Sequence, residues 1–233
     1  NIPAYSTDSV AQLTFSLLLE ICNRVGVHDH AVHAGQWRSS EDFCFCLTPQ
    51  MELAGKTIGV IGFGNIGKQV AKMADAFGMK VLIASSYPDP AFATENIAFA
   101  ALEELLSSSD VISLHCPLTE NNRGMINRES ISKMKDGVIL LNTSRGPLIN
   151  EEDLASALKS GKVSAAGLDV LSVEPPKDGN PLIGLPNCVI TPHIAWITKE
   201  SRVRLINTAV ANLESYLSGE NANCVNRREI NSQ

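Results

Sequence analysis

Arg145, Glu174 and His193 form a set of side chains that can bind a carboxylate and transfer a proton. Arginine presents a planar, permanently charged fork that holds a carboxylate through two parallel hydrogen bonds. Histidine exchanges protons near neutral pH, and a neighbouring carboxylate fixes its tautomer and favours its protonated form. Such a set suits chemistry on a small acid, with the arginine as a clamp, the glutamate as an orienting group and the histidine as a proton carrier. The three residues occur in segments with polar side chains at the ends of apolar runs: residues 142–146, 167–175 and 191–196.

A glycine-rich turn earlier in the chain indicates a phosphate-bearing cofactor. Gly62, Gly64 and Gly67 form the pattern GxGxxG between an apolar run, residues 57–61, and a helical pattern, residues 66–77. In this context the first glycine permits a tight turn, the second lets the backbone approach a pyrophosphate, and the third lets helix and strand pack closely. The helix N-terminus adds free N–H groups that favour an anion. We therefore predict a dinucleotide-binding site, with a glycine turn that binds nothing as the less favoured alternative.

The residue in the position that usually holds the adenosine ribose is Ser85 rather than an acid. The dinucleotide pattern places Asp or Glu about 20 residues after the glycines, at the end of the next strand, where this chain has Ser85. Without a carboxylate, the repulsion of a 2′-phosphate is weaker. However, no Lys or Arg occurs between residues 81 and 122, so a 2′-phosphate has no cation nearby in the sequence. We predict NAD as the cofactor, with NADP as the alternative and Asp89 as a weak substitute for the missing acid.

The segments between these motifs alternate between short apolar runs and helical patterns. Apolar strands that alternate with helices are typical of an α/β protein with a parallel sheet covered on both faces. Right-handed crossovers then give a doubly wound, Rossmann-type sheet of about six strands. Ligands bind beyond the carboxyl ends of such strands, so the glycine turn and the polar segments converge on one edge. The expected strands are residues 57–61, 81–84, 111–114, 138–141, 165–170 and 189–191, and the expected helices are residues 8–27, 66–77, 102–107, 128–134, 151–159 and 199–217.

Composition favours a globular protein and argues against several kinds of partner. The chain has 233 residues and a formal net charge of −6, with 44% hydrophobic and 19% charged residues, so neither disorder nor non-specific nucleic-acid binding is expected. The apolar stretch at residues 13–21 is too short and too polar to span a membrane. The six cysteines include no CxxC pair, which predicts reduced thiols in a cytoplasmic protein. No metal site is predicted, because His28, His30 and His33 do not share one helix face.

Together these motifs resemble the D-isomer-specific 2-hydroxyacid dehydrogenases over essentially the whole chain. Residues 191–196 are most similar to the glycerate dehydrogenase or hydroxypyruvate reductase branch of that family. The resemblance implies hydride transfer between NAD(H) and a small D-2-hydroxy acid or 2-oxo acid, such as glycerate and hydroxypyruvate, or glyoxylate. The similarity rests on the glycine turn, residues 115–119, residues 142–146, Asp169, residues 174–175 and residues 191–193.

The resemblance also implies a role for each site residue. Arg145 would hold the substrate carboxylate and carbonyl oxygen, His193 would protonate that oxygen as hydride arrives, and Glu174 would orient the imidazole. Formate dehydrogenases of the same superfamily carry Gln where this chain has Glu174, so that activity is not expected. Asp169 would bind the nicotinamide amide. The alternative roles are a structural cap for Asp169 and a buried thiol at the end of a strand for Cys116. The implied cofactor contacts are Gly62, Gly64, Gly67, Ser85, Cys116, Thr143, Ser144, Asp169 and His193, together with Asn65 and Ile66 at the pyrophosphate.

The family resemblance further implies an N-terminal lobe before the first helix, which supplies part of the substrate pocket. On this basis residues 1–200 are the dinucleotide-binding domain, and residues 201–233 are a helix and tail that return toward a substrate domain missing from this chain. The chain alone is expected to bind dinucleotide with weak or no turnover. The first helix corresponds to a dimer element in the family, so a homodimer is expected. Trp37, Phe43 and Phe45 are expected to pack rather than to gate substrate.

Two other functions remain open at this stage. Phosphoglycerate dehydrogenase resembles this pattern, and the cations for its substrate phosphate would lie largely in the N-terminal lobe. A non-catalytic, NAD-sensing interaction module of the same fold can retain Arg145, Glu174 and His193. This chain has no long basic or disordered segment for partner binding, which argues mildly against the sensor.

Overall fold

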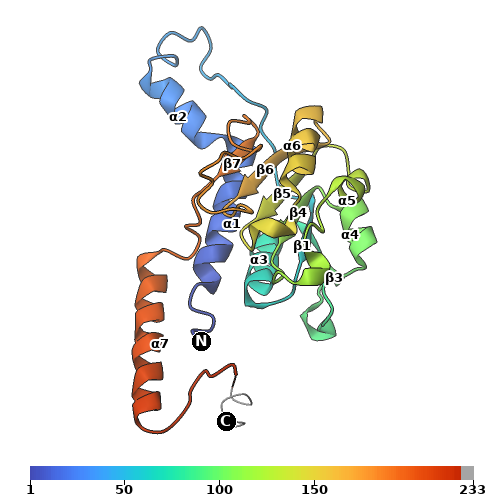
Figure 1. The fold of residues 1–233 in the computed structure, drawn as a ribbon. Helices are drawn as coiled ribbons and strands as arrows, with labels where there is room; N and C mark the ends of the chain where they lie inside the picture. Colours follow the sequence, from blue (N-terminus) through green and yellow to red (C-terminus); the bar gives the residue numbers. More distant parts are fainter. Residues whose placement is uncertain (227–233) are drawn as a thin grey trace.

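A computed structural model of the protein describes residues 1–226 and contains, within that range, one seven-stranded parallel sheet (Figure 1). The strand order is β3-β2-β1-β4-β5-β6-β7, so β1 and β4 are central neighbours. This order is that of the doubly wound dinucleotide-binding fold and confirms the predicted fold class. The strands are β1 (Thr57–Ile61), β2 (Lys80–Ala84), β3 (Ile97–Phe99), β4 (Val111–Leu114), β5 (Val138–Asn142), β6 (Val163–Leu168) and β7 (Cys188–Ile190).

β3 is the strand that the sequence pattern does not predict. The strand has three residues and pairs with β2 alone, at the edge of the sheet. Of these residues only Ile97 is buried, while Ala98 is exposed. The apolar stretch at residues 97–102 continues into α4, so three residues of strand do not stand out in it, and the sheet has one strand more than the six predicted. The other strands lie within two residues of their predicted ends.

Helices cover both faces of the sheet. They are α1 (Thr7–Asn23), α2 (Val25–His33), α3 (Asn65–Ala76), α4 (Leu102–Ser108), α5 (Arg128–Ser132), α6 (Glu151–Ser160) and α7 (Lys199–Leu217), with 3₁₀ turns at Pro90–Phe92, Glu120–Asn122 and Gly146–Leu148. On one face, α1 and α3 pack on the sheet, and Leu18 and Val70 join Val60 in one core. On the other face, Leu105 of α4 and Leu154 of α6 belong to a second core. Burial of these apolar side chains is the main favourable term that holds the sheet between its two helical layers.

The predicted first helix, residues 8–27, is in fact two helices. Arg24 takes a left-handed conformation with φ +47°, which ends α1, and α2 then leaves at a bend of 57°. Gly or Asn usually marks such a stop, so an arginine there gives no signal in the sequence. Among the described residues no single helix is long and apolar enough to cross a membrane, and only the bent pair α1 and α2 reaches that length and apolarity. Much of α1 is buried in the core of this fold.

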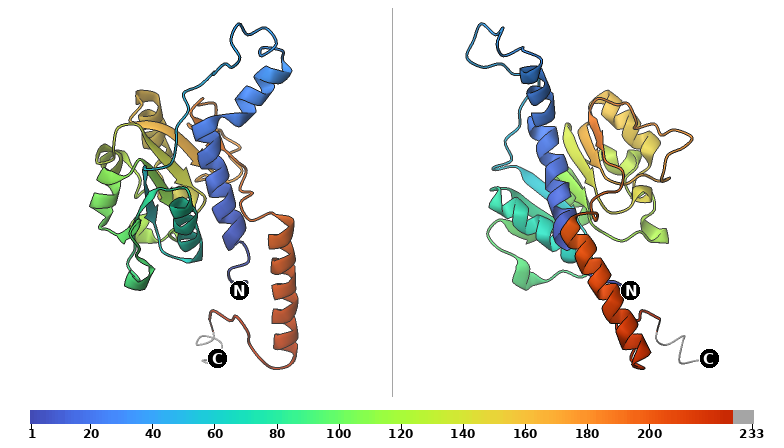
Figure 2. Two further views of the ribbon diagram at one scale, coloured as in Figure 1. Left: turned by 180° about the vertical axis from the view of Figure 1, so that it is seen from behind. Right: turned by 90° about the vertical axis from the view of Figure 1, so that its left-hand side faces the viewer.

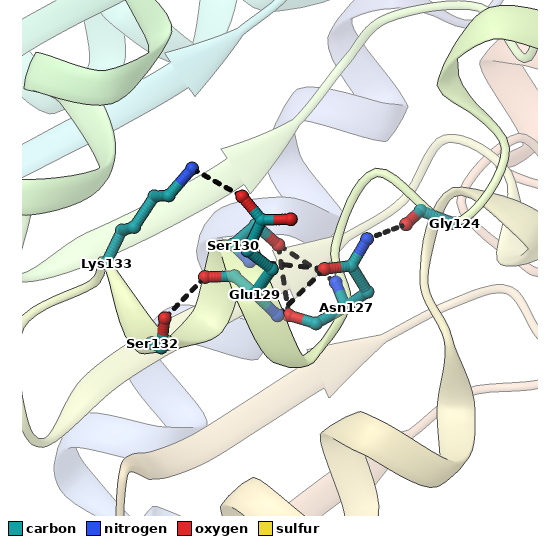
Figure 3. Close-up of polar contacts among 6 residues, drawn as sticks. All are labelled: Gly124, Asn127, Glu129, Ser130, Ser132 and Lys133. Carbon is teal, nitrogen blue, oxygen red and sulfur yellow. Dashed lines mark hydrogen bonds and ion pairs between the residues drawn. The ribbon is translucent and has the colours of Figure 1, made fainter.

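Asn127 starts α5 with a closed set of hydrogen bonds (Figure 3). Its side-chain oxygen accepts the N–H groups of Glu129 and Ser130, at 3.0 and 3.2 Å, and its amide nitrogen donates to the carbonyl of Gly124. Ser130 Oγ accepts the N–H of Asn127 in return. One turn later a hydrogen bond from Lys133 Nζ lowers the pKa of the Glu129 carboxyl. These local bonds stabilise a helix of only five residues on the way into β5.

Two parts of the chain extend away from the sheet and its helices: α2 with the loop after it, and α7 (Figures 1 and 2). Trp37 and Phe43 are 53% and 89% exposed in the single chain, so their expected packing at an interface stays a prediction. In α7, Ser201 is buried and its hydroxyl lies 2.8 Å from that of Ser9 in α1. The predicted division at residue 200 falls at the start of α7, but its meaning as a domain boundary stays a prediction. Residues 227–233 of the expected tail lie outside the described residues.

Candidate active site

The glycine turn connects β1 to α3 at the carboxyl edge of the sheet. Gly62 has φ +106°, which favours glycine, and a Cβ there would lie 2.6 Å from the backbone nitrogen of Cys116. A Cβ on Gly67 would lie 2.1 Å from the carbonyl oxygen of Gly62, so α3 and the turn are in direct contact. The first and third glycines therefore have the expected structural roles, a tight turn and a close helix–strand contact.

Gly64 has a different role, because it leaves open space in front of α3. No atom lies within 4 Å of the point where its Cβ would be, and its φ of −78° is accessible to any residue. No side chain caps the first turn of α3, so the N–H groups of that turn are available to an anion. A bare glycine before an uncapped helix N-terminus fits a pyrophosphate. Asn65 and Ile66 are the first two residues of α3, and their contact with a pyrophosphate stays a prediction.

The corner after β2 carries Ser85, the residue in the ribose position. Ser85 Oγ accepts the N–H of Tyr87 at 3.0 Å, and Asp89 caps the following 3₁₀ turn through the N–H of Ala91. Asp89 is therefore engaged as a cap, which weakens its case as a substitute acid. The fold also brings cations to the aromatic rings near this corner, since Lys68 Nζ lies 4.6 Å from the Phe63 ring centroid. Lys68 is on α3, so the sequence between residues 81 and 122 gives no sign of this cation.

A cavity of about 610 Å³ opens beside the glycine turn and gathers most of the predicted site residues. Its walls come from the segments after β4, β5, β6 and β7, from the start of α3, and from the start of α1 with the segment before it. Glu174 lines a second cavity, of about 460 Å³, which shares Asp169 and His193 with the first. The predicted residues in the first cavity are Ile66, Cys116, Thr143, Ser144, Arg145, Asp169 and His193.

His193 and Glu174 form a close polar pair in this region. His193 Nδ1 lies 2.5 Å from Glu174 Oε2, and Glu174 Oε1 accepts the N–H of Leu171 at 2.9 Å. Because a carboxylate can only accept, Nδ1 carries the hydrogen of this bond. The second ring nitrogen, Nε2, has no partner among the described residues and is left to exchange a proton with a ligand. This is the arrangement that a general acid–base needs.

Asp169 holds the turn that presents His193. Its carboxylate accepts the hydroxyl of Thr191 at 2.5 Å and the N–H groups of Ile194 and Ala195 at 2.8 and 2.9 Å. The N–H of His193 donates to the Asp169 carbonyl, and His193 itself has φ +56°. These bonds offset the cost of a left-handed conformation at a residue other than glycine. Asp169 is thus a structural cap, and its contact with the nicotinamide amide stays a prediction.

Arg145 is placed by a residue that sequence reasoning did not single out, Asn142. The side chain of Asn142 is fully buried, accepts the N–H of Ser144 at 2.9 Å and donates to the carbonyl of Arg145 at 2.9 Å. Ser144 Oγ also donates to the carbonyl of Cys116 at 2.6 Å, which ties the ends of β4 and β5 together. One guanidinium nitrogen of Arg145 donates to the Ser144 carbonyl, and the side chain is otherwise exposed. Its remaining donors can therefore bind a carboxylate.

With this geometry in place, comparison with known proteins decides the family. The family model of the D-isomer specific 2-hydroxyacid dehydrogenase NAD binding domain matches residues 15–195. The chain belongs to this family. It is an NAD-binding domain of the enzymes that transfer hydride between NAD(H) and 2-hydroxy or 2-oxo acids.

Named relatives agree with this family and with the predicted branch. The chain is 57% identical over 227 residues to a hydroxypyruvate reductase of Blautia hydrogenotrophica and 40% identical to a glycerate dehydrogenase of Methylorubrum extorquens. These alignments cover 97% of this chain and 70% of each relative. Among solved structures, the TT0316 protein from Thermus thermophilus matches with a TM-score of 0.85 and 41% identity, covering 96% of this chain and 69% of that one. A D-lactate dehydrogenase from Aquifex aeolicus, complexed with NAD and lactic acid, matches with a TM-score of 0.84 and 37% identity over 94% of this chain and 69% of that one.

The dehydrogenase site also draws residues from the first helix, to which the resemblance gave a role in a dimer, and from the segment before it. Tyr5, Ser6 and Val10 line the 610 Å³ cavity. Thr14 of α1 places its hydroxyl 2.9 Å from that of Thr143, and both residues are buried. Ser9 and Thr14 are the two polar residues among the buried side chains of α1, and this pattern in the sequence could have indicated a polar contact of the helix. Thr143 is therefore held by α1 as well as by its own strand.

His115 is a second histidine on the wall of this cavity, and it was not predicted as a site residue. Burial lowers its pKa from 6.5 to about 4, and its Nε2 lies 2.7 Å from Ser113 Oγ. The ring is therefore neutral at physiological pH and adds no charge to the site. Cys116, which follows it, is half-buried, and burial raises the pKa of its thiol. Both observations favour a structural role for the end of β4.

The low pKa of His115 predicts an acid-sensitive contribution to stability. Between pH 6.5 and about 4 the unfolded state binds this proton and the native state does not, so the free energy of unfolding falls as the pH falls through that window. In the parent protein this fall amounts to up to about 3 kcal/mol, and we expect it to be absent in His115→Gln. Urea denaturation at a series of pH values measures the free energy of unfolding, with His30→Gln on exposed α2 as the control. Equal acid sensitivity in the two variants would contradict the assignment.

The histidines of α2 make local contacts. His28 Nδ1 lies 2.9 Å from the carbonyl of Arg24, and its Nε2 accepts the N–H of Leu47. His33 pairs with Asp29 at 3.4 Å. Within the described residues no three metal-ligating side chains come together. His28 is thus a link between α2 and the loop after it.

Proposed function

We propose that the protein reduces hydroxypyruvate or glyoxylate with NADH and oxidises the corresponding 2-hydroxy acid, D-glycerate or glycolate, in reverse. One observation carries the proposal: Arg145 and His193 line the same cavity, and Glu174 holds His193 through Nδ1 so that Nε2 is free. The names of the relatives at 57% and 40% identity support the choice of substrate. The cavity lies beside the start of α3, where the pyrophosphate fits.

Arg145, His193 and Glu174 have separate roles in the reaction. Arg145 binds the substrate carboxylate and directs the 2-oxo group toward His193. His193 donates the Nε2 proton to the carbonyl oxygen, which becomes the hydroxyl of the product, and takes a proton from that hydroxyl in reverse. Glu174 stays a carboxylate and stabilises the imidazolium through Nδ1. When bound, the nicotinamide supplies or accepts the hydride at the substrate carbon.

A steady-state assay with four 2-oxo acids tests the substrate. NADH oxidation is followed with hydroxypyruvate, glyoxylate, pyruvate and phosphohydroxypyruvate, using the natural gene product and this chain in parallel. We expect the highest kcat/KM with hydroxypyruvate or glyoxylate. A preference for phosphohydroxypyruvate would establish phosphoglycerate dehydrogenase instead, and tight NADH binding with no turnover by the natural product would establish the sensor. Repeating the assay with NADPH tests the consequence of Ser85.

We also propose that the protein is a homodimer that uses α2 and the loop after it. Val25, Trp37 and Phe43 in this region are 64%, 53% and 89% exposed. A projecting element with several large apolar side chains is better suited to an interface than to water. Sedimentation equilibrium of the natural product measures the mass, and a monomer at micromolar concentration would contradict the proposal.

A further inference from the structure

The segment that carries Glu174 has no regular secondary structure of its own to hold it. It lies between β6, which ends at Leu168, and β7, which begins at Cys188. Yet the bond from Glu174 to His193 needs a carboxylate fixed to within a fraction of an ångström. Some contact outside the two strands must therefore set the position of this segment.

Glu151, the first residue of α6, provides that contact on both sides of Glu174. Its Oε1 accepts the N–H of Ser172 at 2.7 Å, and its Oε2 accepts the side-chain N–H of Asn180 at 2.9 Å. Asn180 is oriented in turn, because its Oδ1 accepts the N–H of Leu182 at 3.0 Å. A single carboxylate thus joins two points of the segment, one before and one after the residue that holds His193.

Gly146 fixes the same segment against the arginine turn. A Cβ on Gly146 would lie 1.9 Å from the carbonyl carbon of Leu171 and 2.0 Å from its oxygen, so the two backbones are in contact. The N–H of Leu171 is the group that donates to Glu174 Oε1. Arg145 precedes Gly146 directly, so the clamp for the substrate carboxylate and the partner of the histidine are held at a set separation.

We propose that Glu151 is a positioning residue for the His193–Glu174 pair. It lines neither cavity, so it acts through the segment and not on the substrate. Loss of either of its two bonds lets residues 172–180 shift, which lengthens the bond from Glu174 to His193 Nδ1. The role in turnover rests on the proposed function, while the role in the His193 bond can be observed without substrate.

Glu151→Gln is the direct test, with Glu152→Gln as the matched control. Glutamine still accepts the N–H of Ser172, but its NH₂ group then meets the NH₂ group of Asn180, and a flip of Asn180 would lose the Leu182 bond. Glu152 is the next residue of the same helical turn, and its side chain makes neither of the two bonds that join Glu151 to the segment. Both variants remove one negative charge from the N-terminus of α6, so only the contact differs.

Three results are expected for Glu151→Gln and not for Glu152→Gln. The kcat for reduction falls about 10-fold, below the ~100-fold cost of a 1 Å misplacement, with the Kd for NADH unchanged. The pH at which reduction falls to half its maximum moves lower, because the imidazolium loses part of its carboxylate partner. The downfield proton resonance of His193 Nδ1–H, assigned by its loss in His193→Gln, shifts or disappears in the free protein.

The double variant Glu151→Gln/Asn180→Asp provides the rescue. The aspartate introduced by Asn180→Asp accepts from the new amide and still accepts the N–H of Leu182. The bond between positions 151 and 180 is therefore restored with donor and acceptor exchanged, while the N–H of Ser172 still donates to the oxygen at position 151. We expect this variant to recover the resonance and most of kcat. Equal behaviour of Glu151→Gln and Glu152→Gln, or no recovery in the double variant, would overturn the proposal. If the natural product reduces none of the four acids, the proposed function fails, but the resonance still decides the role of Glu151.

Discussion

Replacing His193 by glutamine lowers kcat for 2-oxo acid reduction by about 10²- to 10⁴-fold, the usual contribution of a general acid–base. Glutamine keeps a hydrogen-bond donor of similar reach but cannot exchange a proton near neutral pH. The Kd for NADH changes much less than kcat, because the pyrophosphate fits the start of α3 and not the histidine turn. Stopped-flow reduction of hydroxypyruvate and fluorescence titration of NADH measure the two quantities.

Glu174→Gln separates the proton carrier from its orienting group. Glutamine at 174 can still accept from Nδ1, which lies 2.5 Å from Oε2 in the parent protein, but it brings no negative charge. The loss in kcat is therefore smaller than for His193→Gln, and the rate of reduction declines at a lower pH. A His193→Gln variant that retained more than about a tenth of the parent kcat would show that the proton comes from another group.

The strands and helices could be predicted from the sequence wherever the pattern of apolar residues within the element was sufficient. β1 and β4 are almost wholly buried and appear in the sequence as short, mainly apolar runs, so their ends were predicted to the residue. β3 and the break at Arg24 depend on tertiary context, namely an edge strand with one buried residue and a left-handed arginine. Neither has a distinctive residue pattern.

The site residues also differ in whether the sequence alone could predict them. Arg145 and His193 were predicted to meet because parallel strands end at one edge, and they do line one cavity. Asn142, Thr14 and Glu151 were missed because each acts through a contact with a distant segment or with a backbone group. Such side chains hold the functional residues in place, and only the folded chain shows which ones they are.

The second large effect is expected from substitutions in the glycine turn, where alanine at Gly64 and alanine at Gly67 should have different consequences. Gly64→Ala adds a methyl group in open space at a φ accessible to alanine, so we expect an unchanged or slightly higher melting temperature. The methyl group occupies the face that the pyrophosphate must approach, at a cost of about 1–3 kcal/mol. NADH affinity therefore falls about 10- to 100-fold. Gly67→Ala, by contrast, forces a Cβ to within 2.1 Å of the Gly62 carbonyl oxygen and destabilises the fold itself.

Gly26→Ala is the control for the chemical change alone. Gly26 is in α2, has one neighbouring atom at 4.0 Å around the new Cβ, and is outside the glycine turn. Thermal denaturation and fluorescence titration of NADH on the three variants give both quantities. Because Gly64→Ala leaves the fold intact, a loss of affinity in that variant reports on the binding face alone. Parent-like affinity in Gly64→Ala would mean that the pyrophosphate does not approach α3 at this glycine.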